Sequence, residues 1–107
     1  MMQTQIDTVL RALADPTRRA VFERLMRSEL NVAELTATSG VTQGAVSQHL
    51  RHLKQAGLAV ERPDGRRTFY RARPEGLTPL FDWLSHYETF WREGFAELRA
   101  LLKEIDP

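Results

Sequence analysis

One face of a predicted helix over residues 42–56 gathers hydrogen-bonding side chains. Val46, Leu50 and Leu53 are spaced four and three residues apart, which predicts an apolar stripe turned toward a core. The opposite face then carries Gln43, Gly44, Ser47, Gln48, Arg51 and Lys54, with Thr42 as the cap at its start. Glutamine pairs with adenine edges, arginine with guanine, and serine with bases or phosphate, so these types suit a DNA groove. An ordinary solvated face is the alternative.

A second group of cations lies at the tip of a predicted hairpin. Residues 59–62 and 67–72 alternate in the manner of two strands. The turn between them contains Asp64-Gly65, a pair that accepts the left-handed backbone that tight hairpins need. Arg66 and Arg67 follow at once, where they could contact phosphates or an adjacent minor groove.

Charge is distributed unevenly along the chain, although the whole sequence carries only +1. Residues 42–73 hold seven basic and two acidic side chains, a net charge of +5, whereas residues 77–107 hold three basic and six acidic ones, a net charge of −3. A basic middle segment favours a localised surface for a polyanion. Chance clustering on a solvated surface explains the charge pattern alone equally well.

Capping signals predict two short helices joined by a tight turn. Asn31 and Glu34 form a capping-box pattern that opens a helix over residues 31–39, and Gly40 supplies the turn before Thr42. We expect two earlier helices, at residues 4–14 and from Pro16 to about Ser28. The second of these is expected to turn Ala20, Val21, Leu25 and Met26 inward, with Phe22 flanking.

The last part of the chain predicts one long helix over residues 78–105, with Thr78 as its cap. Its aromatic residues, including Trp83 and Phe90, exceed what so small a domain can cover, and such patches usually mark a partner surface. We therefore expect residues 78–105 to form a homodimer contact, in preference to packing within one chain. The expected interface residues of this helix are Leu84, Tyr87, Trp91, Phe95, Leu98 and Leu102.

These elements predict a mainly α fold with a two-stranded β-wing, a winged helix-turn-helix in a single domain over residues 1–107, with the helix-turn-helix at 31–56 and the wing at 58–73. No nucleophile–base pattern or phosphate-binding glycine loop is present, so an enzyme is the weakest class of function. The sequence has no cysteine, no membrane-length apolar run and no secretory signal pattern, which favours the cytoplasm.

The chain resembles the ArsR/SmtB family of winged-helix repressors along nearly its full length. Three segments carry the resemblance, at residues 12–19 (ALADPTRR), 45–58 (AVSQHLRHLKQAGL) and 65–70 (GRRTFY). The resemblance implies a homodimer that sits on a palindromic operator and leaves it when an effector binds. It also implies that the first and last helices, residues 4–14 and 78–105, form the dimer interface, with Ile6 and Leu10 as the expected interface residues of the first helix.

The metal-binding patterns of that family are not met. Members carry an E-L-C-V-C-D-L motif on the third helix, where this chain has Asn31 and Ala33 in place of the two cysteines. A second family site needs an Asp and a His two residues apart on the last helix, but here His86 lies four residues after Asp82. We therefore expect no metal and no cofactor. The family likeness suggests packing or DNA-facing roles for His49 and His52.

Three functions remain open on this basis. The first is a repressor that binds double-stranded DNA as a homodimer. The second is a metal-responsive sensor that uses the last helix, and the third is an interaction module without DNA binding. The effector could be a small apolar molecule between the aromatic helices or a partner protein. The protein could also have no effector.

Overall fold

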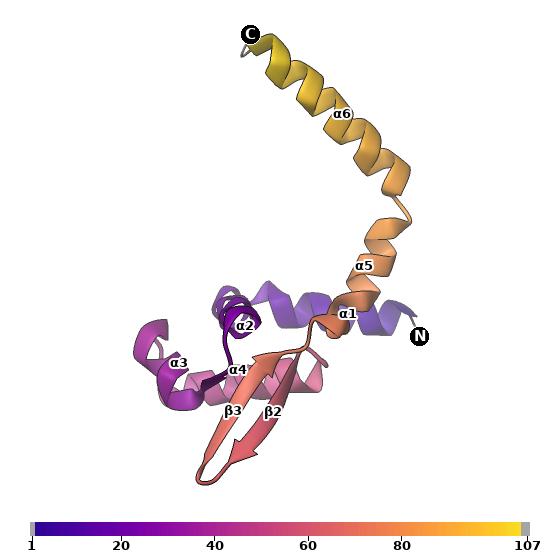
Figure 1. The fold of residues 1–107 in the computed structure, drawn as a ribbon. Coiled ribbons are helices and arrows are strands. Elements are labelled where there is room, and N and C mark those ends of the chain that lie inside the picture. Colours follow the sequence, from indigo (N-terminus) through magenta and orange to yellow (C-terminus); the bar gives the residue numbers. More distant parts are fainter. Residues whose placement is uncertain (1, 106–107) are drawn as a thin grey trace.

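A computed structural model describes residues 2–105, so Met1, Asp106 and Pro107 of the expected 1–107 domain lie outside the described residues. Ten elements follow one another: α1 (Met2–Ala14), α2 (Pro16–Arg27), β1 (Leu30–Asn31), α3 (Val32–Ser39), α4 (Gln43–Gln55), β2 (Ala59–Asp64), β3 (Arg67–Ala72), a 3-10 turn η1 (Pro74–Leu77), α5 (Thr78–Ser85) and α6 (Glu88–Ile105). Figure 1 shows α6 projecting away from the other elements as an arm. The mainly helical class with a β-wing is confirmed.

The sheet has three antiparallel strands in the order β1-β3-β2, and not the expected two. β1 is only two residues long, with Leu30 opposite Tyr70 and Asn31 opposite Phe69. It is too short to show alternation in the sequence, and Asn31 also caps α3. The hairpin turn lies one residue later than expected, because β2 continues to Asp64, which pairs with Arg67 around the two residues Gly65 and Arg66. Gly65 has φ 62, the left-handed conformation expected of this turn.

A core between α2, α3, α4 and the sheet fixes the direction of α4. The predicted stripe on α4 is buried, since Val46, Leu50 and Leu53 are at most 1% exposed. On α2, Val21 and Leu25 are buried as expected. The expectation was wrong for Ala20 and Met26, which are exposed, whereas Phe22 is buried in their place. The buried face of α2 is therefore rotated by a fraction of a turn toward Phe22.

A close backbone approach joins the end of α4 to the segment before α5. Gly76 in η1 is buried, and a Cβ built on it would lie 2.2 Å from the carbonyl oxygen of Gly57. Only glycine allows this approach, because a real Cβ would collide with the backbone. The contact sets where α5 begins, and α5 then packs against α1.

The predicted single helix over 78–105 is wrong in one respect, since it is broken at residues 86–87 into α5 and α6. The Ser85 hydroxyl donates to the Phe81 carbonyl at 2.8 Å, an arrangement that bends helices. The Tyr87 N–H bonds to the Leu84 carbonyl three residues back, so the last turn of α5 is tightened. Thr78 is also not the cap; it is already helical, and Leu77 precedes it in the capping position.

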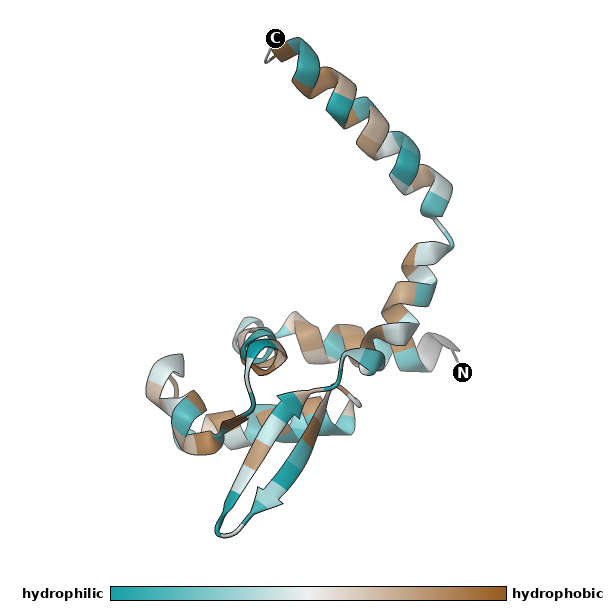
Figure 2. Ribbon diagram, viewed as in Figure 1, coloured by the Kyte–Doolittle hydropathy of each residue, from teal (hydrophilic) through white to brown (hydrophobic). Residues whose placement is uncertain are grey.

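The arm lacks a partner among the described elements. Every described residue of α6 is exposed, and Phe90, Leu101 and Ile105 are 64%, 53% and 70% exposed. Figure 2 shows hydrophobic residues recurring along the whole length of α6. The radius of gyration is 17.8 Å, against about 13 Å for a compact chain of this length. No helix within residues 2–105 is long and apolar enough to cross a membrane.

Candidate nucleic-acid interface

The start of α4 is fixed by a side-chain cap. The Thr42 hydroxyl accepts a hydrogen bond from the Ala45 N–H at 3.1 Å, and Thr42 itself is exposed. Before it, Gly40 takes φ 74 in the turn after α3, as predicted. The capping box is present too, since the Asn31 side chain accepts from the Glu34 N–H at 2.8 Å and the Glu34 carboxylate accepts from the Asn31 N–H at 2.9 Å. Side-chain caps thus fix where α3 and α4 begin, and Gly40 forms the turn between them.

The face of α4 opposite the core is exposed along its length. It comprises Gln43, Gly44, Ser47, Gln48, Arg51 and Lys54, the same residues that the helical spacing selects. Arg51 lies near Gln48, with Nη1 3.4 Å from Oε1, so the pair presents a guanidinium and an amide side by side. These groups offer donors and acceptors at the spacing of successive helical turns.

The wing brings two more cations toward the start of α4. Arg66 and Arg67 are exposed at the hairpin tip and have no ion-pair partner among the residues that the structure describes. Both line a hollow of about 470 Å³ that also borders Gln43 on α4 and Asn31 and Glu34 on the other side. Figure 1 shows the β2–β3 hairpin extending beyond the helices. The structure thus places the wing arginines and the first turn of α4 around one concavity.

Several cations of the basic segment are already paired with carboxylates. Lys54 of the predicted face forms an ion pair with Glu61 of β2. Arg62 pairs with Glu29 at 2.6 Å and lies 3.8 Å from Asp64. The hydrogen bond from Arg62 lowers the pKa of the Glu29 carboxyl below its ordinary value and raises the pKa of the guanidinium. The sequence did not reveal these partners, and they leave Arg51, Arg66 and Arg67 as the freer cations of the surface.

A hydrogen-bond network links α1, α2 and α4 behind this face. The Arg18 guanidinium donates to the carbonyls of Arg11 and Ala12 at the end of α1, at 3.0 and 2.6 Å. Its Nη1 lies 3.1 Å from Nδ1 of His52 on α4. His49, by contrast, is half-buried, and its buried Nδ1 has no hydrogen-bond partner among the described residues. His52 therefore links α4 to α2, whereas His49 packs against its neighbours. The residue type alone did not distinguish these two roles.

The cap of α2 adjoins the same network. Asp15 accepts from the Arg18 N–H at 3.0 Å, and that hydrogen bond lowers the pKa of its carboxyl. Asp15 and Pro16 therefore open α2 as the sequence predicts.

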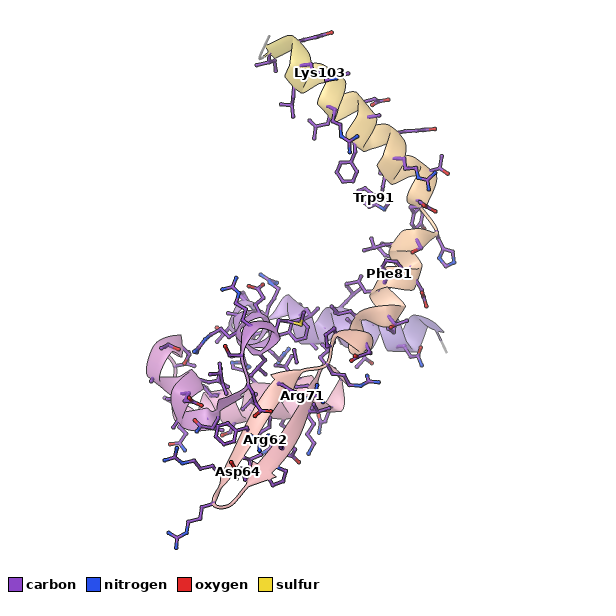
Figure 3. The ribbon with its side chains drawn as sticks, in the orientation of Figure 1. Arg62, Asp64, Arg71, Phe81, Trp91 and Lys103 are labelled. Atoms are coloured by element: carbon purple, nitrogen blue, oxygen red, sulfur yellow. The ribbon has the colours of Figure 1, made fainter. Side chains whose placement is uncertain are left out.

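The residues predicted for a dimer interface lie on α1, α5, α6 and the break between the last two. Leu10, Tyr87, Trp91, Phe95, Leu98 and Leu102 are exposed, and Ile6 and Leu84 are half-buried. Where α5 meets α6, a concavity of about 820 Å³ is lined by Phe81, Leu84, Trp91 and Phe95. Figure 3 shows Phe81 and Trp91 on the two sides of the bend.

The candidate ligands of the metal alternative lie on different elements of the last part of the chain. Among residues 2–105, no three His, Asp or Glu side chains gather in a way that could hold a metal ion. Asp82 lies on α5, whereas His86 lies at the break after it. The possible further ligands Glu93 and Glu97 lie on α6 beyond the bend.

Comparisons with known proteins agree with this geometry. Residues 15–60 match the model of the family described as "Bacterial regulatory protein, arsR family". The chain is 45% identical to the HTH-type transcriptional regulator Rv2034 of Mycobacterium tuberculosis, over 86% of each protein. It is 44% identical to the HTH-type transcriptional repressor SmtB of the same species, over 73% of this chain and 58% of that protein.

A solved structure shows a similar fold. It is the solution structure of the homodimeric winged helix-turn-helix DNA-binding domain of a possible ArsR-family transcriptional regulator from Mycobacterium bovis. The two chains share 28% identity with a TM-score of 0.66, over 81% of each. The similarity extends beyond the segment that the family model matches.

Proposed function

Because the chain belongs to the arsR family of bacterial transcriptional regulators, we propose that it is a repressor that binds a palindromic operator as a homodimer. One relative is named a transcriptional repressor, and one similar structure is a homodimeric DNA-binding domain. Operator binding would place the protein with the chromosome, in the cytoplasm.

The observation that carries the proposal is the exposed polar face of α4. The opposite face of the helix packs on the core through Val46, Leu50 and Leu53 and so keeps the polar face turned outward. A helix of this width enters the major groove of B-DNA, where Gln48 and Arg51 could reach base edges. Thr42, Gln43 and Ser47 at the start of α4 suit phosphates or bases, because the N-terminal residues of such helices lie deepest in the groove. Arg66 and Arg67 would contact the backbone or the neighbouring minor groove.

Gly44 supports the same orientation. A Cβ on this residue would meet nothing nearer than the Thr42 hydroxyl at 4.0 Å, so the fold of the single chain does not require glycine there. Its lack of a side chain would instead allow the start of α4 to approach DNA closely. Replacement by alanine should therefore leave the fold intact and weaken operator binding.

The dimer would form through α1, α5 and α6. Large aromatic and aliphatic side chains are exposed along these helices, and an extended exposed apolar patch is typical of a partner surface. In a two-fold symmetric dimer each α4 would meet one half-site, with half-sites about 10 bp apart.

Fluorescence anisotropy with DNA from upstream of the protein's own gene tests the proposal. Arg51→Ala and Ser47→Ala should each weaken specific binding by about 1–3 kcal/mol. Arg27→Ala removes an exposed arginine from the end of α2 and serves as the matched control. If Arg51→Ala and Arg27→Ala bind equally well, the face of α4 is not the reading surface.

A further inference from the structure

The β-wing needs an anchor to hold its tip in a defined direction. The β2–β3 hairpin extends beyond the helices. β1 pairs with β3 only at Phe69 and Tyr70, in the middle of that strand, so the hairpin between these residues and its tip is two-stranded. Two-stranded hairpins are marginally stable without further contacts. Contacts with the rest of the domain must therefore limit the motion of Arg66 and Arg67.

Arg62 supplies such a contact on the outer face of the sheet. Its Nε and Nη2 donate to Oε1 of Glu29, at 3.0 and 2.6 Å, across 33 residues of sequence. The guanidinium carbon also lies 5.2 Å from the ring centroid of Phe69, the residue directly opposite Arg62 in the β3 register. Asp64 adds a weaker ion pair at 3.8 Å. Figure 3 labels Arg62 and Asp64 along the hairpin, with Arg71 nearer its base.

A second tie holds the other face of the same strand. Glu61 forms an ion pair with Lys54 of α4. Because consecutive residues of a strand point to opposite faces, Glu61 and Arg62 attach β2 on both sides. One tie leads to α4, and the other leads to the segment between α2 and β1 that contains Glu29.

We propose that Glu29 and Arg62 are positioning residues, which aim the wing so that Arg66 and Arg67 meet DNA phosphates. The proposal rests on the operator binding proposed above. The proposal and simple electrostatics predict opposite effects on DNA affinity when the Glu29 charge is removed. Removal of a negative charge beside a DNA-binding surface should strengthen binding through Coulomb attraction, whereas loss of the anchor should weaken it.

The test compares Glu29→Gln with Glu23→Gln, which makes the same charge change on an exposed residue of α2. Operator affinity should fall roughly two- to fivefold in Glu29→Gln, the range expected for an exposed ion pair, and should not fall in Glu23→Gln. Arg66→Ala should cost less affinity in the Glu29→Gln background than in the wild type. The exchanged pair Glu29→Arg with Arg62→Glu keeps the net charge and should restore part of the loss.

Amide hydrogen exchange of β2 and β3 in the absence of DNA gives a second readout. Exchange near the hairpin tip should be faster in Glu29→Gln than in Glu23→Gln. Unchanged exchange, or operator binding as tight as that of Glu23→Gln, would overturn the anchor. If the wild type binds no DNA while exchange still responds, the anchor stands and the proposed operator binding fails.

Discussion

The helix-turn-helix body (α2, α3, α4 and the sheet) and the α6 arm contain similar apolar residues. These residues are buried in the body and exposed in the arm. In the body, Leu35, Leu50, Leu53 and Leu58 are at most 1% exposed, and their helices contact each other and the sheet. In the arm, Leu98, Leu101 and Leu102 are about half exposed, and the described part of α6 buries none of its residues. The helices of the body and α6 all have apolar residues at helical spacing. Amphipathic periodicity therefore identifies an apolar face of a helix and does not say what covers it.

The two regions depend on different partners for their stability. The body gains its stability within one chain, through caps, a closed core and a sheet. The arm has the same pattern without a surface to pack on, which is the property expected of an element that folds fully only in an assembly. Changes in the two regions should consequently affect different measurements.

The largest effect is expected from Leu53→Ala in the body. It should reduce the free energy of unfolding by about 2–5 kcal/mol, because it leaves a cavity in a closed core. The matched change Leu102→Ala in the arm should cost less than about 0.5 kcal/mol in dilute protein. Urea denaturation at low protein concentration measures both. Similar losses for the two variants would show that α6 packs within its own subunit.

The next effect concerns association. Trp91→Ala should weaken the dimer by about 2 kcal/mol, the cost typical of a buried aromatic residue at an interface. Glu93→Ala on the polar side of α6 is the control and should leave association unchanged. Sedimentation equilibrium over a range of concentrations gives the dissociation constants. A dimer that survives Trp91→Ala unchanged would remove the arm from the interface.

A smaller effect is expected from the cap that joins the sheet to the helix-turn-helix. Asn31→Ala removes the acceptor for the Glu34 N–H and should destabilise the body by about 1 kcal/mol. The loss should be equal at low and high protein concentration, because the cap lies in the body. Thermal unfolding at two concentrations checks this, and a concentration-dependent loss would contradict it.

The smallest effect is a pH dependence at the wing. The pKa of Glu29 is lowered by its hydrogen bond from Arg62, so its stabilising contribution is present above the ordinary value of 4.5 and is lost as the pH falls below it. The melting temperature of the wild type should therefore exceed that of Glu29→Gln above pH 4.5, and the two should converge in more acidic solution. A difference that does not change with pH would assign the effect to another contact.

Local signals in the sequence predicted the body well. Asn31 and Thr42 cap their helices and Gly40 forms the turn, each with a residue type that the backbone requires, and Gly65 does the same for the hairpin. The four- and three-residue spacing on α4 then identifies its buried and exposed faces. These features depend on neighbours within a few residues, which is why one sequence suffices.

Features that depend on distant residues were missed. The break at residues 86–87 has no proline or glycine, and the apolar stripe continues through it. Glu29 and Arg62 lie 33 residues apart, and Arg18 and His52 lie 34 apart, so no spacing rule connects them. The strand β1 exists only because β3 lies beside it. Sequence reasoning therefore found the exposed polar face of α4 and missed the contacts that hold the wing.

The proposed function requires the exposed face of α4 to read an operator while paired arms hold two such faces together. A footprint of the purified protein on DNA upstream of its own gene examines both requirements at once. We expect a two-fold symmetric protected region with half-sites about 10 bp apart, which disappears with Arg51→Ala at protein concentrations where Arg27→Ala still protects. Protection without symmetry, or protection that Arg51→Ala leaves intact, would contradict the proposed function.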